Sequence, residues 1–195
     1  MKFLSKFKFS RDFIFNKFSL SWAEDKYERI EAFIDKNETL LDLGAGKCAL
    51  SYKLKKEGFE VTPVDVQDLS FHPEIKPLIY DGQHLPFADD SFDTVLLLTV
   101  LHHIPDPELV LKEALRVGRK VIVIEDVYNS QLQKYLTYFT DSLFNFEFVG
   151  HPHTNKKDQE WKKLFKKLNL ELRAEREDQV LKFYTQKTYY LIKEA

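Results

Sequence analysis

Acidic residues and glycines follow several apolar runs in the first half of this chain, at positions where they could bind a ligand. Residues 40–49 contain an apolar run, an acid and two alternating glycines. Asp65 follows at a strand–helix–strand distance, and a further acid precedes a glycine at Asp81-Gly82. A glycine lets the backbone approach a ligand closely, and an acid at this distance can accept hydrogen bonds from ribose hydroxyls. The spacing therefore predicts a site for a nucleotide-like ligand, whose adenine amino group Asp81 could bind.

Alternating strand and helix patterns must position these residues. We expect strands at residues 39–43, 59–64, 76–80, 92–100 and 119–126, helices at 47–57, 107–117 and 156–168, and a closing hairpin with strands at 170–177 and 180–193. Alternating β and α units form a parallel sheet with right-handed crossovers. The predicted fold is α/β, with a doubly wound, Rossmann-like sheet of seven strands that is mostly parallel and has an antiparallel C-terminal hairpin strand. Ligands bind beyond the carboxyl ends of such strands, so the acids and glycines should share one crevice.

Two prolines bear on the boundaries of these elements. Asp106-Pro107 is a strong helix start, because aspartate caps a helix and proline suits the first helical position. Pro63 lacks the N–H that a central strand needs, so we place it at the frayed end of the second strand. Residues 67–76 are too short and too broken for a full crossover helix.

The composition excludes several classes of protein. The chain has 195 residues, of which 44% are hydrophobic, and 29 basic residues nearly balance 31 acidic ones, so that nucleic acid is not expected as a partner. The single cysteine, Cys48, excludes an internal disulfide and a cysteine-based zinc site, and it favours a reducing, cytoplasmic location. No apolar run approaches the roughly 20 residues of a membrane-spanning helix. His151-Pro152-His153 has no acid or cysteine at ligand spacing, so we expect no metal.

The segment from Leu40 to Asp126 resembles the class I S-adenosylmethionine-dependent methyltransferases. The likeness is greatest to the small-molecule group that includes the ubiquinone and menaquinone biosynthesis methyltransferases. Its ordered motifs are Asp42-Leu-Gly-Ala-Gly46, Val64-Asp65, residues 81–87 with 90–93, residues 101–107 and Glu113-Ala-Leu-Arg-Val117. The set covers about half of the chain and is more specific than any one of its parts.

The resemblance implies S-adenosylmethionine as cofactor and methyl transfer as the reaction. The cofactor-binding residues that it implies are Asp42, Gly44, Ala45, Gly46, Asp65, Val66, Asp81, Gly82 and Leu98. Two departures from the family pattern stand out. Cys48 replaces the third motif glycine, where it could crowd the cofactor or simply pack, and the turn before the fifth strand is shortened to residues 117–119.

His102 is the best candidate for a catalytic base. Its position resembles that of the histidine base in some plant small-molecule O-methyltransferases. In the alternative interpretation, His102 and His103 are structural residues at a strand-to-helix turn. The acceptor could be aromatic or apolar, because residues 135–161 are rich in aromatic side chains that could line a pocket.

We expect a single methyltransferase domain over residues 1–195. Within it, residues 1–38 form a helical cap, residues 39–126 bind the cofactor, and residues 127–195 supply the substrate side and the closing hairpin. In the cap, Tyr27, Ile30, Phe33 and Ile34 form a helical apolar stripe. In one interpretation the cap packs on the core, and in another it forms a lid over the substrate. In a third, residues 1–20 contact a membrane surface, because basic side chains flank their aromatic ones.

Two further functions stay open from the sequence. The glycines of residues 44–46 with Asp65 nearly satisfy the fingerprint of nicotinamide- or flavin-binding proteins, although residues 85–93 have no counterpart there. A non-catalytic S-adenosylmethionine-binding partner or sensor would carry the same binding motifs.

Overall fold

The computed structural model describes residues 18–131, 133–135, 154–180 and 184–194. Its seven strands are β1 (Thr39–Leu43), β2 (Glu60–Asp65), β3 (Leu78–Ile79), β4 (Phe92–Leu98), β5 (Gly118–Val127), β6 (Leu170–Val180) and β7 (Tyr184–Lys193). Its helices are α2 (Ala49–Lys56), α3 (Pro107–Val117), α5 (Asp158–Lys167) and the helix over residues 18–30, with short 3-10 turns at Glu31–Phe33 and Leu101–His103.

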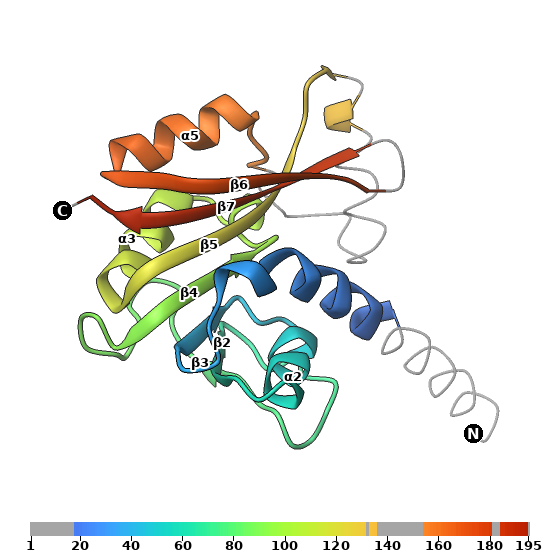
Figure 1. Cartoon of the computed structure of the whole chain (residues 1–195), viewed down its shortest axis with the longest axis vertical. Coiled ribbons are helices and arrows are strands. Elements are labelled where there is room, and N and C mark those ends of the chain that lie inside the picture. Colours follow the sequence, from blue (N-terminus) through green and yellow to red (C-terminus); the bar gives the residue numbers. More distant parts are fainter. Residues whose placement is uncertain (1–17, 132, 136–153, 181–183, 195) are drawn as a thin grey trace.

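All seven strands form one sheet in the order β3-β2-β1-β4-β5-β7-β6 (Figure 1). The first five pair in parallel, whereas β7 runs antiparallel to both of its neighbours, β5 and β6. The predicted α/β fold is therefore confirmed, with a mostly parallel sheet and one antiparallel strand from the closing hairpin.

The sheet buries a hydrophobic core on each of its faces. On one face Val121 and Val123 of β5 pack in a cluster with residues of α3 and α5. On the other face Ile122 and Ile124 pack in a cluster with residues of α2 and the helix over 18–30. Because alternate residues of one strand point to opposite faces, the continuous apolar run of β5 serves both cores. This two-sided covering, visible in Figure 1, confirms the doubly wound architecture.

The start of α3 follows the predicted capping chemistry. The Asp106 carboxylate accepts hydrogen bonds from the backbone N–H groups of Glu108, at 3.1 Å, and Leu109, at 3.3 Å, and Pro107 is the first helical residue. The helix ends at Val117, as expected. Gly118 follows it, and a Cβ there would lie 2.4 Å from Cγ2 of Val95, so the close approach of α3 to β4 needs a glycine.

Some predicted boundaries were wrong. Pro63 lies inside β2, not at its frayed end, and it pairs in register with Asp42 of β1. The other neighbour, β3, pairs only with Val64 and Asp65, so Pro63 has no residue of β3 opposite it and its missing N–H is tolerated. That third strand is two residues long, where we expected five. The fourth strand ends at Leu98, not at residue 100, because Thr99 has a left-handed backbone with φ 62°.

The apolar residues predicted as a helical stripe of the cap do pack together, but the α-helix ends at Ile30, Phe33 lies in the 3-10 turn and Ile34 is extended. Ile30 is fully buried against the sheet, and Tyr27, Phe33 and Ile34 are partly buried in the same cluster. The phenylalanines of residues 1–17 lie outside the described residues.

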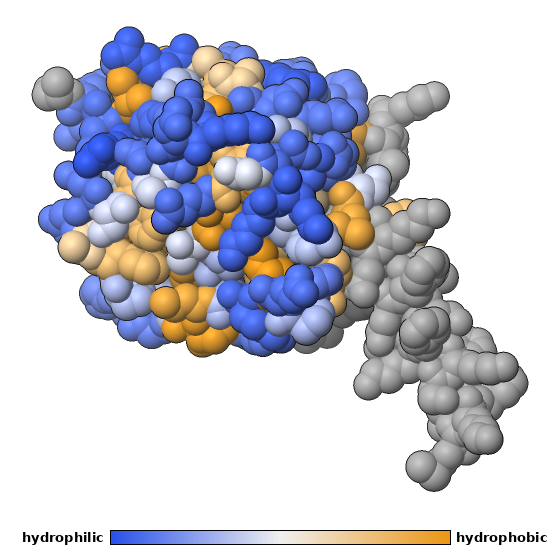
Figure 2. Space-filling view, turned by 60° about the horizontal axis from the view of Figure 1, so that its bottom comes forward, coloured by the Kyte–Doolittle hydropathy of each residue, from blue (hydrophilic) through white to orange (hydrophobic). Residues whose placement is uncertain are grey.

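Hydrophilic side chains predominate on the face shown in Figure 2, where hydrophobic areas are interspersed among them. Four exposed hydrophobic residues, Val66, Leu69, Leu78 and Ile79, belong to β3 and the loop before it. Within the described residues, the structure contains no helix that is both long and apolar enough to cross a membrane.

Candidate functional site

The turn after β1 and the acid at the end of β2 are joined directly by hydrogen bonds. The backbone N–H groups of Gly44 and Ala45 donate to the Val64 carbonyl, at 2.9 and 3.0 Å. The Asp65 carboxylate accepts from the backbone N–H of Gly46, at 2.7 Å, through Oδ2. These bonds bring the predicted glycine turn and the predicted ribose-binding acid together at the carboxyl edge of the sheet.

The glycine turn has the left-handed backbone that favours glycine, with φ 79° at Gly44 and 51° at Gly46. A Cβ at Gly44 would lie 2.6 Å from Cγ1 of Val100, whereas a Cβ at Gly46 would have no heavy atom within 4 Å. Gly46 therefore faces open space beside Asp65. A ligand can approach the backbone there, as the S-adenosylmethionine site of the resemblance requires.

Cys48 is packed in the interior behind the turn. Its side chain is fully buried, and it has the left-handed φ of 57° that a glycine would adopt more easily. Burial raises the pKa of the Cys48 thiol to about 12. The cysteine that replaces the third motif glycine is therefore an unreactive packing residue.

Asp42 points away from the open space in front of the turn. Its carboxylate is buried and accepts a hydrogen bond from the Ser51 hydroxyl of α2, at 2.5 Å. Desolvation raises the pKa of Asp42, and the bond from Ser51 opposes that change. The side chain thus joins β1 to α2, and its predicted contact with the cofactor stays a prediction.

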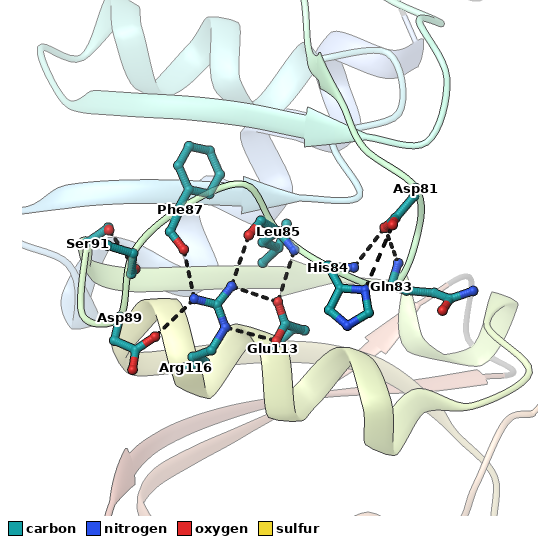
Figure 3. Close-up of polar contacts among 10 residues, drawn as sticks. Asp81, Gln83, His84, Leu85, Phe87, Asp89, Ser91, Glu113 and Arg116 are labelled. Atoms are coloured by element: carbon teal, nitrogen blue, oxygen red, sulfur yellow. Dashed lines mark hydrogen bonds and ion pairs between the residues drawn. The ribbon is translucent and has the colours of Figure 1, made fainter.

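The loop after β3 forms a second wall beside Asp65. Oδ1 of Asp81 accepts hydrogen bonds from the backbone N–H groups of Gln83 and His84, at 2.8 and 2.7 Å, which lowers its pKa (Figure 3). Gly82 approaches Val66 so closely that an added Cβ would lie 3.4 Å from Cγ1 of Val66, a side chain that is 54% exposed. An exposed apolar side chain between two acids suits an adenine ring with polar edges.

Arg116 of α3 holds the loop after β3, which carries Asp81 and Gly82, in place. Its guanidinium donates to the carbonyls of Leu85, at 2.9 Å, and Phe87, at 2.7 Å, and its side chain pairs with Glu113 at 2.8 Å (Figure 3). Glu113 in turn accepts from the backbone N–H of Leu85, at 2.9 Å, and the bonds from Arg116 lower its pKa. The sequence showed both residues as part of a family pattern, but their role in holding this loop was not predicted.

A lysine from the cap reaches the end of β4. Nζ of Lys26 donates to the Leu98 carbonyl, at 2.8 Å, and to the Thr99 hydroxyl, at 2.7 Å. The carbonyl of Leu98 is thus in contact with an ammonium group at the predicted cofactor site. No sequence motif pointed to Lys26, because it lies among other charged residues on a helix.

His102 forms a buried pair with Glu125 of β5. Nδ1 of His102 lies 2.6 Å from Oε2 of Glu125, and the two side chains are 1% and 0% exposed. Oε1 of Glu125 accepts from the backbone N–H groups of Val100, at 3.0 Å, and Leu101, at 2.7 Å. A carboxylate that orients an imidazole suits a general base, and it equally suits a structural turn. The catalytic role of His102 stays a prediction.

The structure bears only in part on the expectations for the histidine pair and the aromatic residues 135–161. His151 and His153 lie outside the described residues, as do most aromatic side chains of residues 135–161. Trp161 is fully buried in the core of the α5 face, so it does not line a pocket. Among the residues that the structure describes, no group of three or more histidine, cysteine or acidic side chains could hold a metal ion.

Part of this chain is similar to known methyltransferases. Residues 41–121 match the family model described as a methyltransferase domain. Demethylmenaquinone methyltransferase from Streptomyces griseus is 35% identical over 97 residues, which cover 45% of this chain and 42% of that protein. The chain spans about half the length of the curated relatives it matches.

The solved structures extend the likeness to the fold. A SAM-dependent methyltransferase from Methanosarcina mazei superimposes with a TM-score of 0.66 and 20% identity, covering 84% of this chain and 96% of that one. The SpnF cyclase superimposes with a TM-score of 0.67 and 12% identity, covering 90% of this chain and 81% of that one. Both show the same fold.

Together, the match of residues 41–121 to a methyltransferase domain, the curated relatives and the shared fold confirm the resemblance to class I S-adenosylmethionine-dependent methyltransferases that was predicted from the sequence.

Proposed function

We propose that this protein transfers a methyl group from S-adenosylmethionine to a small aromatic or apolar acceptor in the cytoplasm. The observation that carries the proposal is the junction of Gly46 and Asp65 at the carboxyl edge of the sheet, beside open space. The match of residues 41–121 to a methyltransferase domain supports it.

The residues at this edge fit the parts of the cofactor. Asp65 would hold the ribose, because a carboxylate has about four acceptor positions and the backbone N–H groups of Gly46, Val66 and Gln67 do not fill all of them. Val66 and Gly82 would face the adenine. The Gly44–Gly46 turn would lie under the methionine end, beside Leu98 at the end of β4.

When bound, the cofactor supplies a methyl group on a positively charged sulfur, which needs no further activation. The protein then has to hold the acceptor in line and exclude water. His102, oriented by Glu125, is the candidate for removing a proton from the acceptor. If the acceptor binds already deprotonated, the same pair serves only to fix the turn after β4.

The names of the relatives favour a quinone-like acceptor. Several curated proteins that share the matched segment are called demethylmenaquinone methyltransferases. That likeness covers about half of each chain, so the acceptor is part of this proposal. Nucleic acid is not expected as a substrate, because the net charge of the chain is -2.

A non-catalytic S-adenosylmethionine-binding protein is the second candidate. The superposition with the SpnF cyclase shows that this fold occurs in a protein named for a different reaction. Fold alone therefore does not fix the chemistry.

Calorimetric titration of the full chain with S-adenosylhomocysteine, NAD and NADP tests the cofactor. We expect micromolar binding of S-adenosylhomocysteine alone, and binding of a nicotinamide cofactor instead would overturn the assignment. Incubation with methyl-labelled S-adenosylmethionine and a panel of hydroquinones, catechols and polar amines then tests the acceptor. Label on the aromatic compounds supports the proposal. Binding without transfer to any acceptor would favour the non-catalytic candidate.

A further inference from the structure

Lys26 joins the cap to the edge of the sheet where the cofactor is expected. The residue belongs to the helix over 18–30, which packs on the α2 face of the sheet. Its ammonium nevertheless donates to the Leu98 carbonyl and the Thr99 hydroxyl at the carboxyl end of β4. Asp42 pairs in register with Leu96, so Leu98 lies beside the first glycine of the Gly44–Gly46 turn.

The acids around Lys26 are already engaged by other donors. Burial lowers the pKa of Lys26, and the charges of Asp42, Asp126 and Glu125 oppose that change. Yet Asp42 accepts from Ser51, Asp126 accepts from Gln186 at 2.7 Å, and Glu125 accepts from two backbone N–H groups. Arg29, the nearby cation, pairs with Asp25 at 2.5 Å. Among the described residues, the hydrogen bonds of the Lys26 ammonium therefore go to a carbonyl and a hydroxyl.

An ammonium group has three N–H donors, and these two acceptors use two of them. The residue as a whole is half-buried, and its third donor is not used by either of these acceptors. A lysine held against neutral oxygens in a partly desolvated position is a strong binder for a carboxylate, because a charged hydrogen bond gains strength out of water.

The amino-acid end of S-adenosylmethionine carries a carboxylate and an ammonium group. Its ammonium group is bound best by oxygen acceptors and its carboxylate by a cation, and the Gly44–Gly46 turn carries no charged side chain. We propose that Lys26 binds this carboxylate, so that cofactor binding also fixes the helix over residues 18–30. The inference rests on the proposed function and adds a cofactor-binding residue from outside the matched segment.

Three ligands that differ stepwise test the role of Lys26. S-adenosylhomocysteine has the whole amino-acid end, 5′-S-(3-aminopropyl)-5′-thioadenosine lacks only the carboxylate, and 5′-methylthioadenosine lacks the entire end. Calorimetry on the wild-type full chain should show at least tenfold weaker binding of the aminopropyl compound than of S-adenosylhomocysteine. In Lys26→Met that difference should shrink to less than threefold, while 5′-methylthioadenosine binds as it does to the wild type. Lys26→Arg should restore most of the difference.

Lys112→Met is the matched control, because this exposed lysine pairs with Glu108 and belongs to α3, which packs on the other face of the sheet from the helix over residues 18–30. It should leave the affinities for all three ligands unchanged. An unchanged preference for the carboxylate in Lys26→Met, or an equal loss of all three ligands, would refute the proposal. The wild-type comparison alone refutes it if both amino-acid ligands bind equally, even where the variant fails to fold. Binding of no ligand by the wild type would refute the proposed function, and this inference with it.

Discussion

Gly44 lies so close to Val100 that no side chain fits between them. A Cβ at Gly44 would be 2.6 Å from Cγ1 and 2.7 Å from Cγ2 of Val100, distances that real Cβ atoms do not adopt. The turn after β1 is thereby pressed against the segment that follows β4. Gly46, two residues on, shares the left-handed backbone but has nothing within 4 Å of an added Cβ.

This contrast predicts different costs for two alanine substitutions. Gly44→Ala combines backbone strain with a steric clash and should lower the free energy of unfolding by about 3 kcal/mol. Gly46→Ala carries the strain alone and should cost about 1 kcal/mol. Denaturant unfolding measures both. Adding Val100→Ala to Gly44→Ala should recover part of the loss, and equal costs for the two single variants would contradict the steric explanation.

Asp65→Ala should weaken the binding of S-adenosylhomocysteine at least tenfold, or about 1.4 kcal/mol. The substitution removes the ribose acceptor and also the bond that holds the Gly46 N–H. Asp68→Ala is a suitable control, since Asp68 accepts a backbone hydrogen bond from Ser70 within the same exposed loop. Calorimetry should find its affinity within twofold of the wild type. Unchanged affinity in Asp65→Ala would overturn the placement of the ribose.

Arg116→Ala should destabilise the protein by about 2 kcal/mol, because it removes the guanidinium that donates to the Glu113 carboxylate and to the carbonyls of Leu85 and Phe87. Arg119→Ala is the matched comparison. Arg119 pairs with Asp93 on the surface, with a side chain that is 64% exposed, so its loss should cost less than about 0.5 kcal/mol. Denaturant unfolding of both variants checks the difference. Similar values for the two arginines would show that the loop does not depend on Arg116.

Asp93 should make the stability of the protein depend on pH. Its carboxylate accepts hydrogen bonds from the backbone N–H of Thr39, at 3.0 Å, and from the Thr39 hydroxyl, at 2.9 Å, which lower its pKa. The pKa is thus lower in the folded than in the unfolded state. The stabilisation is present above the unfolded value of about 4, and it is lost as the pH falls through the folded value.

Asp93→Asn should therefore cost about 1 kcal/mol at pH 7 and progressively less below about pH 4, where the wild-type carboxyl group also becomes neutral. Denaturant unfolding between pH 2.5 and 7 measures the difference. A constant difference across this range would show that the charge of Asp93 does not contribute.

The sequence was most informative where local chemistry decides the structure. Asp106 and Pro107 specify the start of α3 through capping and a fixed φ, so the helix begins where it was expected. The first strand matches residue for residue, because an apolar run before a glycine turn has few alternatives. The position of Asp65 beside the turn followed from the regular length of a strand–helix–strand unit.

What the sequence did not show depends on contacts between distant elements. Pro63 was misplaced because its tolerance depends on how far β3 runs alongside β2, and β3 pairs only with Val64 and Asp65. Lys26 meets Leu98 across 72 positions, and Arg116 meets Phe87 across 29. A charged residue on a helix has the same local pattern whether it faces water or reaches a strand end, so neither role was visible beforehand.

The position of β7 between β5 and β6 has a consequence for how the chain folds during synthesis. The ribosome makes β6 before β7, yet β6 lies at the edge of the sheet and pairs with β7. Until β7 is made, β6 has no neighbouring strand to pair with. The sequence of β6 is rich in glutamate and arginine, and these charges oppose aggregation of the unpaired strand. When β7 inserts, it pairs with β5 and β6 at the same time. Completion of the sheet is therefore expected to be a single late event and not a gradual addition of strands.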